Sequence, residues 1–282
     1  MIIKGENIEI PEVSRVKVKK MNHIVEVTYI EKKNQELLRY KKISKDEMVD
    51  KTTGEIIQVE HKEDRKGNIS SLRRTISNLR DIINTNFVGG ENELFITLTY
   101  AENMKDTERL YKDFDKFYKK LKRRLRGHEL LYISVVEPQE RGAWHVHLLL
   151  KDLTCESLYI HNEEIEKMWG QGFTKTERLH HVDNVGAYLS AYLTNIKEGE
   201  ETKKGQRLYL YPPGMNIYRC SRNVKRPIIV EKEYKQVKEK LEKYKTYEST
   251  YIVIDIDENI NGVRQLKQLN CIKKEYYNTR RL

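Results

Sequence analysis

The chain has 282 residues, of which 38% are hydrophobic and 34% are charged, and its net charge is +10. This length allows one large or two small domains, and the positive charge predicts a polyanionic partner such as a nucleic acid. No apolar stretch has the length that crosses a bilayer, and the three widely spaced cysteines argue against a disulfide framework or a CxxC zinc site, so we expect a cytoplasmic protein with no membrane partner.

Residues 1–68 are predicted to form an N-terminal β-rich extension, because β-branched residues alternate there with charged turns. We expect strands at residues 16–18, 24–30 and 56–59. Apolar residues at helical spacing between Leu72 and Ile83 then predict a helix near the start of the central segment, residues 69–200.

The central segment continues with a predicted strand at residues 94–100 and a long helix that begins near Asp106. Apolar residues fall on one side of this helix, at Leu110, Phe114, Phe117, Leu121 and Leu125. Lysine and arginine cover most of the rest, which is ordinarily a solvated face. Given the charge of the chain, we also predict phosphate contacts by Lys119, Arg123 and Arg124.

Two histidines mark the next pair of strands. Residues 131–137 are predicted to pair with residues 144–150 through a hairpin-length connection. Side chains alternate along a strand, so His145 and His147 point to the same face, and the hairpin brings the Glu137 carboxylate beside them. Two imidazoles and one carboxylate suit a divalent metal and leave positions for water and a phosphate oxygen, although two isolated histidines are more often structural.

Two tyrosines lie one turn apart on the following helix. The apolar spacing from Val185 to Ile196 predicts this helix, with Asp183 as its cap. Tyr188 and Tyr192 share its apolar face, which also fits two core tyrosines. A phenol with its ordinary pKa near 10 is a poor nucleophile, and a metal that polarises the phosphate makes it competent.

Residues 201–282 are predicted to form a C-terminal α/β extension. It contains a basic patch near residues 219–226, a helix over about residues 231–244 and a strand at residues 251–256. No sequence motif in this extension indicates chemistry of its own.

Three ordered blocks resemble the HUH-superfamily rolling-circle replication initiators (Rep proteins), in particular those of small plasmids and filamentous-phage-like elements. The blocks are residues 95–100, residues 137–147 and residues 185–192. The resemblance implies an α+β fold in which helices flank a central antiparallel sheet, similar to a ferredoxin-like palm. It also implies Mg²⁺ or Mn²⁺ held by His145, His147 and Glu137, and a tyrosine that nicks single-stranded DNA at an origin hairpin, remains attached through a 5′-phosphate and later religates. The host polymerase and helicase are the expected further partners.

The chain departs from this family where relatives carry lysines three residues after the tyrosines. Ala191 and Asn195 occupy these positions, and Lys197 is an off-register substitute. We include Lys197 and Arg141, which lies in the metal block, among the expected DNA-binding residues. Two other hypotheses stay open, namely another HUH enzyme such as a transposase or relaxase, and a non-catalytic single-strand binder that regulates replication.

Overall fold

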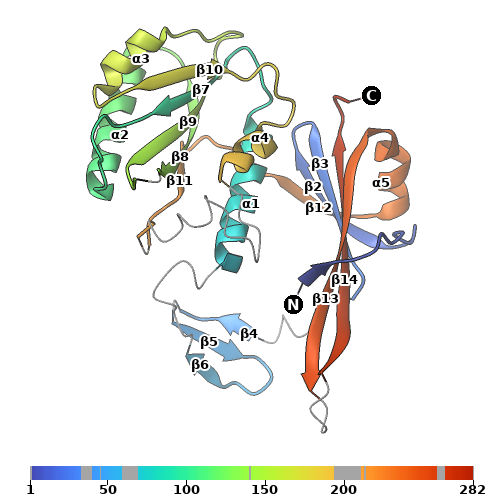
Figure 1. The fold of residues 1–282 in the computed structure, drawn as a ribbon. Helices are drawn as coiled ribbons and strands as arrows, with labels where there is room; N and C mark the ends of the chain where they lie inside the picture. The colour runs from blue at the N-terminus through green and yellow to red at the C-terminus, as the bar shows by residue number, and fades with distance from the viewer. Residues whose placement is uncertain are drawn as a thin grey trace. The chain divides into compact units, whose positions relative to one another are not determined.

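The computed structural model describes residues 2–32, 40–44, 46–58, 69–139, 141–193, 211–212, 214–258 and 264–281, with backbone alone at 69–72, 190–193, 255–258 and 264–267. The chain divides into two compact units (Figure 1). The central unit spans Glu63–Pro227, and the second combines Met1–Lys62 with Ile228–Leu282. Within these described ranges, no helix is long and apolar enough to span a bilayer.

The central unit is built on a five-stranded antiparallel sheet with the order β10-β7-β9-β8-β11. Its strands are β7 (Glu93–Leu98), β8 (Leu130–Pro138), β9 (Trp144–Asp152), β10 (Thr174–Arg178) and β11 (Tyr218–Cys220). Its helices are α1 (Ile69–Asn86), α2 (Thr107–Arg124), α3 (Asn162–Trp169) and α4 (Val185–Leu193). The predicted α+β class with a central antiparallel sheet is therefore confirmed.

The sheet has helices on both faces, with α2 and α3 on one side and α1 and α4 on the other (Figure 1). Even-numbered residues of β8 and β9 face α2, where the rings of Phe114 and Tyr132 lie 5.7 Å apart. Odd-numbered residues face α1, where the Lys151 ammonium donates to the Asn86 carbonyl at 2.9 Å. His147, an odd-numbered residue, therefore shares the α1 face.

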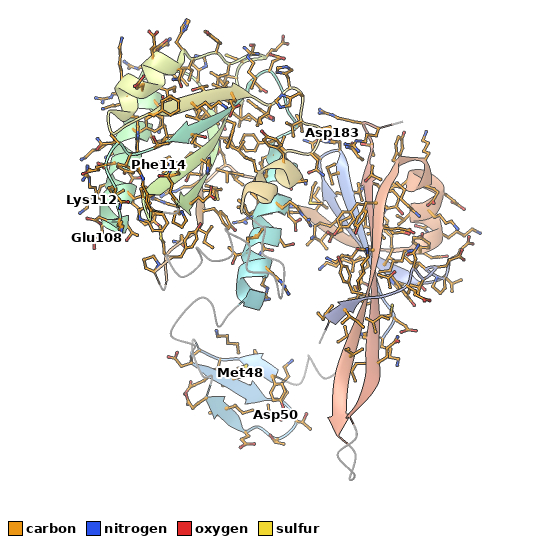
Figure 2. All side chains as sticks on the ribbon, in the orientation of Figure 1. Met48, Asp50, Glu108, Lys112, Phe114 and Asp183 are labelled. Atoms are coloured by element: carbon orange, nitrogen blue, oxygen red, sulfur yellow. The ribbon has the colours of Figure 1, made fainter. Side chains whose placement is uncertain are left out.

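Helix α2 forms where the sequence predicts it. The Asp106 carboxylate accepts from the backbone N–H groups of Glu108 and Arg109, which caps the first turn. Phe114 is buried, whereas Glu108 and Lys112 lie on the exposed side of the helix (Figure 2). Basic residues in the last turn favour the helix dipole.

Helices α1 and α4 approach closely at Gly186. Its backbone N–H donates to the Asn84 side chain at 2.7 Å, and a Cβ added there would lie 2.6 Å from the Arg80 carbonyl. Asn184 caps α4, because its side chain accepts from the Ala187 N–H at 2.9 Å. The prediction that Asp183 is the cap was wrong by one residue.

The second unit contains a six-stranded sheet with the order β1-β13-β14-β3-β2-β12, in which all neighbours are antiparallel. Its strands are β1 (Ile2–Lys4), β2 (Arg15–Met21), β3 (Ile24–Ile30), β12 (Ile228–Glu233), β13 (Lys245–Glu258) and β14 (Arg264–Asn278). Helix α5 (Tyr234–Leu241) and the short 3-10 helix η4 (Glu242–Tyr244) separate β12 from β13. The N-terminal and C-terminal extensions, predicted as separate segments, thus contribute to one sheet.

A further three-stranded sheet has the order β4-β5-β6. Its strands are β4 (Tyr40–Lys42), β5 (Glu47–Asp50) and β6 (Ile56–Gln58). Asp50 accepts from the N–H of Thr52 at 2.8 Å and stabilises the turn between β5 and β6. The turn and the strand after it lie where the sequence predicts them, whereas the predicted linker at residues 61–67 lies outside the described residues.

Candidate metal and tyrosine site

The hairpin of β8 and β9 brings two of the predicted metal ligands into contact. Glu137 is the cross-strand partner of His145, which places it diagonally from His147 on the same face. The His147 Nε2 lies 3.0 Å from the Glu137 Oε2. The two side chains are 14% and 17% exposed, so the contact is shielded but reachable from solvent.

His147 is also held from the neighbouring strand β7. Thr97 is its cross-strand partner there, and the Thr97 Oγ1 lies 3.3 Å from the His147 Nδ1. The Phe95 ring stacks on the imidazole, with centroids 5.6 Å apart and planes inclined by 15°. One ring nitrogen therefore faces a hydroxyl and the other faces a carboxylate, which is how histidine ligands are commonly oriented in metal sites.

His145 lies one strand position away on the same face. Its ring centroid is 6.3 Å from that of His147, and the two planes are inclined by 78°. The start of this strand is anchored, because the buried Trp144 donates its indole N–H to the Lys105 carbonyl at 3.0 Å. The two histidines are thus fixed by the strand on which they stand.

The donor set fits a divalent cation. An octahedral ion with bonds of about 2.1 Å holds adjacent ligands about 3.0 Å apart. The Glu137 oxygen and the His147 nitrogen have that spacing. Mixed oxygen and nitrogen ligands without sulfur suit Mn²⁺ and are compatible with Mg²⁺.

Of the two predicted nucleophiles, the structure describes the side chain of Tyr188. It is half-buried on α4, and its ring lies edge-on to that of His181, with centroids 6.4 Å apart. The side chains of Ala191 and Tyr192 fall outside the described part of α4, as do Asn195 and Lys197 in full.

Sequence reasoning passed over His181 as a polar residue before the helix. The pair His180-His181 next to a tyrosine helix is the pattern that points to it. The two imidazoles lie edge to face, with centroids 5.5 Å apart, and both are exposed.

Arg141 is close to the candidate ligands along the chain, in the connection between β8 and β9. Its guanidinium donates to the Tyr100 carbonyl at 3.3 Å and to the Gln139 side chain at 3.0 Å. Gly142 follows it with φ of 85°, a conformation that favours glycine and lets the hairpin turn. The exposed Arg141 is therefore held at the end of the hairpin that carries Glu137 and His145.

The basic residues of α2 are not brought to this site. Lys119, Arg123 and Arg124 are exposed on a helix that covers the opposite face of the sheet. Arg124 forms an ion pair with Glu164 of α3 at 2.6 Å. Phosphate contacts by these residues stay a prediction, and they would involve a different face from that of His147.

Comparison with known families links this geometry to replication. Residues 93–197 match the family model of the replication-associated protein ORF2. The matched segment runs from β7 beyond α4 and includes Glu137, His145, His147 and both tyrosines. No curated protein and no solved structure gives a match. The match to the ORF2 family supports a role in DNA replication and an interaction with nucleic acid, as the sequence predicts.

Proposed function

We propose that this protein is a rolling-circle replication initiator that nicks and religates single-stranded DNA through a phosphotyrosine intermediate. The observation that carries the proposal is the contact between Glu137 and His147 inside the segment that matches the ORF2 family. A carboxylate and an imidazole at metal-ligand spacing, upstream of a tyrosine helix, match the order of groups that this chemistry needs.

Glu137, His147 and His145 would hold Mg²⁺ or Mn²⁺. When bound, the ion withdraws electrons from the scissile phosphate and stabilises its negative charge. Thr97 and Phe95 keep the His147 ring in place, and Arg141 offers a guanidinium for the DNA backbone at the same hairpin.

Tyr188 is the proposed first nucleophile. Its phenolic oxygen attacks phosphorus, the bond from phosphorus to the 3′ oxygen breaks, and the departing oxygen takes a proton to become a 3′ hydroxyl. The 5′ phosphate stays on the tyrosine, and the free 3′ end serves as a primer for the host polymerase. Tyr192 then takes the second transfer or supports the first.

The proposed DNA partner is single-stranded, as in an origin hairpin from which a host helicase would extend the opening. The net charge of +10 supports phosphate binding. Arg141 and Lys197 are the proposed contacts beside the chemistry, and Lys119, Arg123 and Arg124 offer a separate basic surface on α2.

The covalent link provides the test. A pool of end-labelled single-stranded oligonucleotides with a randomised hairpin loop is incubated with the full chain and Mn²⁺, and covalent adducts are separated on a denaturing gel. We expect Tyr188→Phe to lower adduct yield below about 1% of wild type, because phenylalanine preserves packing and removes only the attacking oxygen. Tyr192→Phe should form the first adduct and lose strand transfer.

Two matched variants test the metal ligands. His147→Ala should abolish the adduct, whereas His161→Ala, which changes an exposed histidine at the start of α3, should leave it unchanged. Chelation should stop the wild-type reaction and added Mn²⁺ should restore it. Adducts that persist in excess chelator would reject the metal, and adducts that persist in the double tyrosine variant would reject the helix as nucleophile.

A further inference from the structure

A second group of ligand-type side chains lies at the other end of the hairpin strands. Asp152 ends β9 and is the cross-strand partner of Leu130, the first residue of β8. His128 precedes β8, and Cys155 follows β9. The seven residues from Leu130 to Glu137 rise about 3.3 Å each, so about 20 Å of strand separates this group from Glu137. It is therefore distinct from the site described above.

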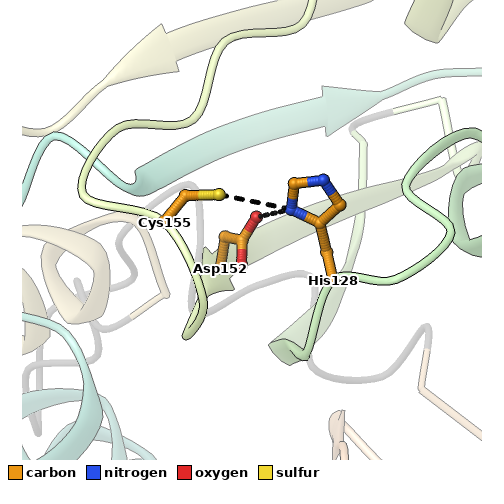
Figure 3. A group of neighbouring side chains, drawn as sticks. All are labelled: His128, Asp152 and Cys155. Atoms are coloured by element: carbon orange, nitrogen blue, oxygen red, sulfur yellow. Dashed lines mark hydrogen bonds and ion pairs between the residues drawn. The ribbon is translucent and has the colours of Figure 1, made fainter.

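The three side chains converge on one point (Figure 3). The His128 Nδ1 lies 2.5 Å from the Asp152 Oδ2 and 3.4 Å from the Cys155 Sγ. The ligand atoms of all three lie within 4.8 Å of one another. This convergence is present among side chains that come from two separate loops.

Asp152 is prepared to act as a charged ligand. Its side chain is fully buried, and its Oδ1 accepts from the Thr154 hydroxyl at 2.6 Å and from the Thr154 N–H at 2.9 Å. Burial by itself would raise the pKa of the Asp152 carboxyl, but the hydrogen bonds from Thr154 and His128 outweigh it and hold the pKa below its ordinary value. Oδ1 is thereby fixed, and Oδ2 is directed at His128.

The geometry differs from a catalytic cysteine triad. In such a triad the nucleophile and the carboxylate contact different nitrogens of one imidazole, so that a proton can pass through the ring. Here both the thiol and the carboxylate approach the Nδ1 of His128. Three donors that face one another, rather than a linear chain, are the arrangement that a cation completes.

We propose that His128, Asp152 and Cys155 form a binding site for a borderline divalent transition metal, with Zn²⁺ as the best match. Thiolate, imidazole and carboxylate are the three ligand types of protein zinc sites. With bonds of about 2.0–2.3 Å at tetrahedral angles, nitrogen and sulfur are about 3.6 Å apart and nitrogen and oxygen about 3.4 Å. The existing contacts of 3.4 Å and 2.5 Å reach these values when the Asp152–His128 pair opens by less than about 1 Å.

The role that follows is a clamp between two loops. A metal here ties the loop after α2 to the loop after β9, at the end of the sheet away from Glu137. His128 is 34% exposed, so a fourth position is open to water or to a further ligand. The cysteine is thiolate in the metal-bound form, and its proton is released to solvent.

Cobalt substitution reports the ligand set directly. The full chain is stripped with chelator and titrated with Co²⁺, which gives a thiolate-to-cobalt charge-transfer band in the near ultraviolet when a cysteine is bound. We expect a band that saturates at one equivalent in the wild type and is displaced by Zn²⁺. Cys155→Ser and His128→Ala should each lose it, and Cys220→Ser, which changes another partly exposed free cysteine of the same unit, should retain it.

The double variant His145→Ala/His147→Ala separates this site from the proposed nicking site, because it should keep the band and lose adduct formation. Thermal unfolding provides the second measurement, since a ligand of the folded state raises the Tm. Zn²⁺ should raise the Tm of the wild type and of Cys220→Ser but not that of Cys155→Ser. Absence of the band in the wild type, or its survival in a Cys155→Ser protein with native circular dichroism, would overturn the proposal.

Discussion

His147 is positioned by three different residues. Glu137 faces one of its ring nitrogens, Thr97 faces the other, and Phe95 stacks on the ring. The hydroxyl of Thr97 is the group whose effect can be isolated, because it touches the histidine and not the Glu137 oxygen in the described contacts.

Removing that hydroxyl should weaken the metal site without unfolding the sheet. We expect Thr97→Val to reduce Mn²⁺ affinity by about 10–100-fold, the usual effect of losing an outer partner of a histidine ligand. Calorimetric titration measures the affinity, and Thr97→Ser should restore most of it. Equal affinity in Thr97→Val and wild type would show that Thr97 does not orient the ring.

A buried charge in the second unit gives a pH prediction. Glu26 is 3% exposed, and burial alone would raise its pKa, but Lys274 and Lys19 lower the pKa of its carboxyl below the ordinary value. A depressed carboxyl pKa stabilises the folded state above the unfolded pKa, and this contribution is lost as the pH falls through the folded pKa.

We therefore expect Glu26→Gln to destabilise the protein by about 1–3 kcal/mol near neutral pH, with a difference that shrinks toward acid. Urea unfolding at several pH values measures this, and Glu231→Gln, which changes an exposed ion-pair residue, is the control. A difference that grows as the pH falls would contradict the assigned direction.

At the scale of elements, the packing of α1 against α4 decides where Tyr188 stands. The small pair Gly186-Ala187 suggested an opening for DNA beside the tyrosine. Instead, Gly186 is buried at the crossing with α1, where its N–H binds Asn84, and Ala187 alone of the pair is exposed. The glycine is needed for contact between helices.

Gly186→Ala tests this contact. The added Cβ would lie 2.5 Å from the Asn84 Oδ1, so the helices must separate, and we expect a loss of about 1–3 kcal/mol in the free energy of unfolding. Ala187→Ser, on the exposed neighbour, should change stability by less than about 0.5 kcal/mol. Urea unfolding compares the two, and an undiminished midpoint for Gly186→Ala would show that α4 packs differently.

At the scale of the whole molecule, each unit has its own core. One hydrophobic cluster includes Leu79, Phe117 and Leu148 of the central unit, and another includes Val27, Val237 and Tyr277 of the second unit. Strands β12, β13 and β14 follow the central unit in the chain, yet they share a sheet with β1, β2 and β3.

Truncation experiments should follow these units. We expect residues 63–227 to fold alone and to retain adduct formation, because the unit contains its own core and the matched motifs. Removal of residues 228–282 from the full chain should instead cause aggregation, because strands β1 to β3 lose their partners and expose edges. Circular dichroism, gel filtration and the adduct assay measure both, and an unfolded 63–227 fragment would contradict the independence of that unit.

The sequence alone determined the local elements of the central unit. The alternation around His145 and His147, the short connection from Glu137 and the apolar side of α2 are local patterns, and the structure has each of them. It could not choose between Asp183 and Asn184 as the cap of α4, because both residue types cap helices and the choice depends on the packing of the helix.

Only the tertiary structure decided which distant segments pair. Strand β14 carries charged residues at buried positions, which hides its alternation, and Lys273 is tolerated there because it pairs with Glu248 of β13 at 3.1 Å. His128, Asp152 and Cys155 likewise meet through the pairing of β8 with β9. Sequence periodicity reports which face of an element is apolar, whereas the partner of that face is fixed by contacts between segments far apart in the chain.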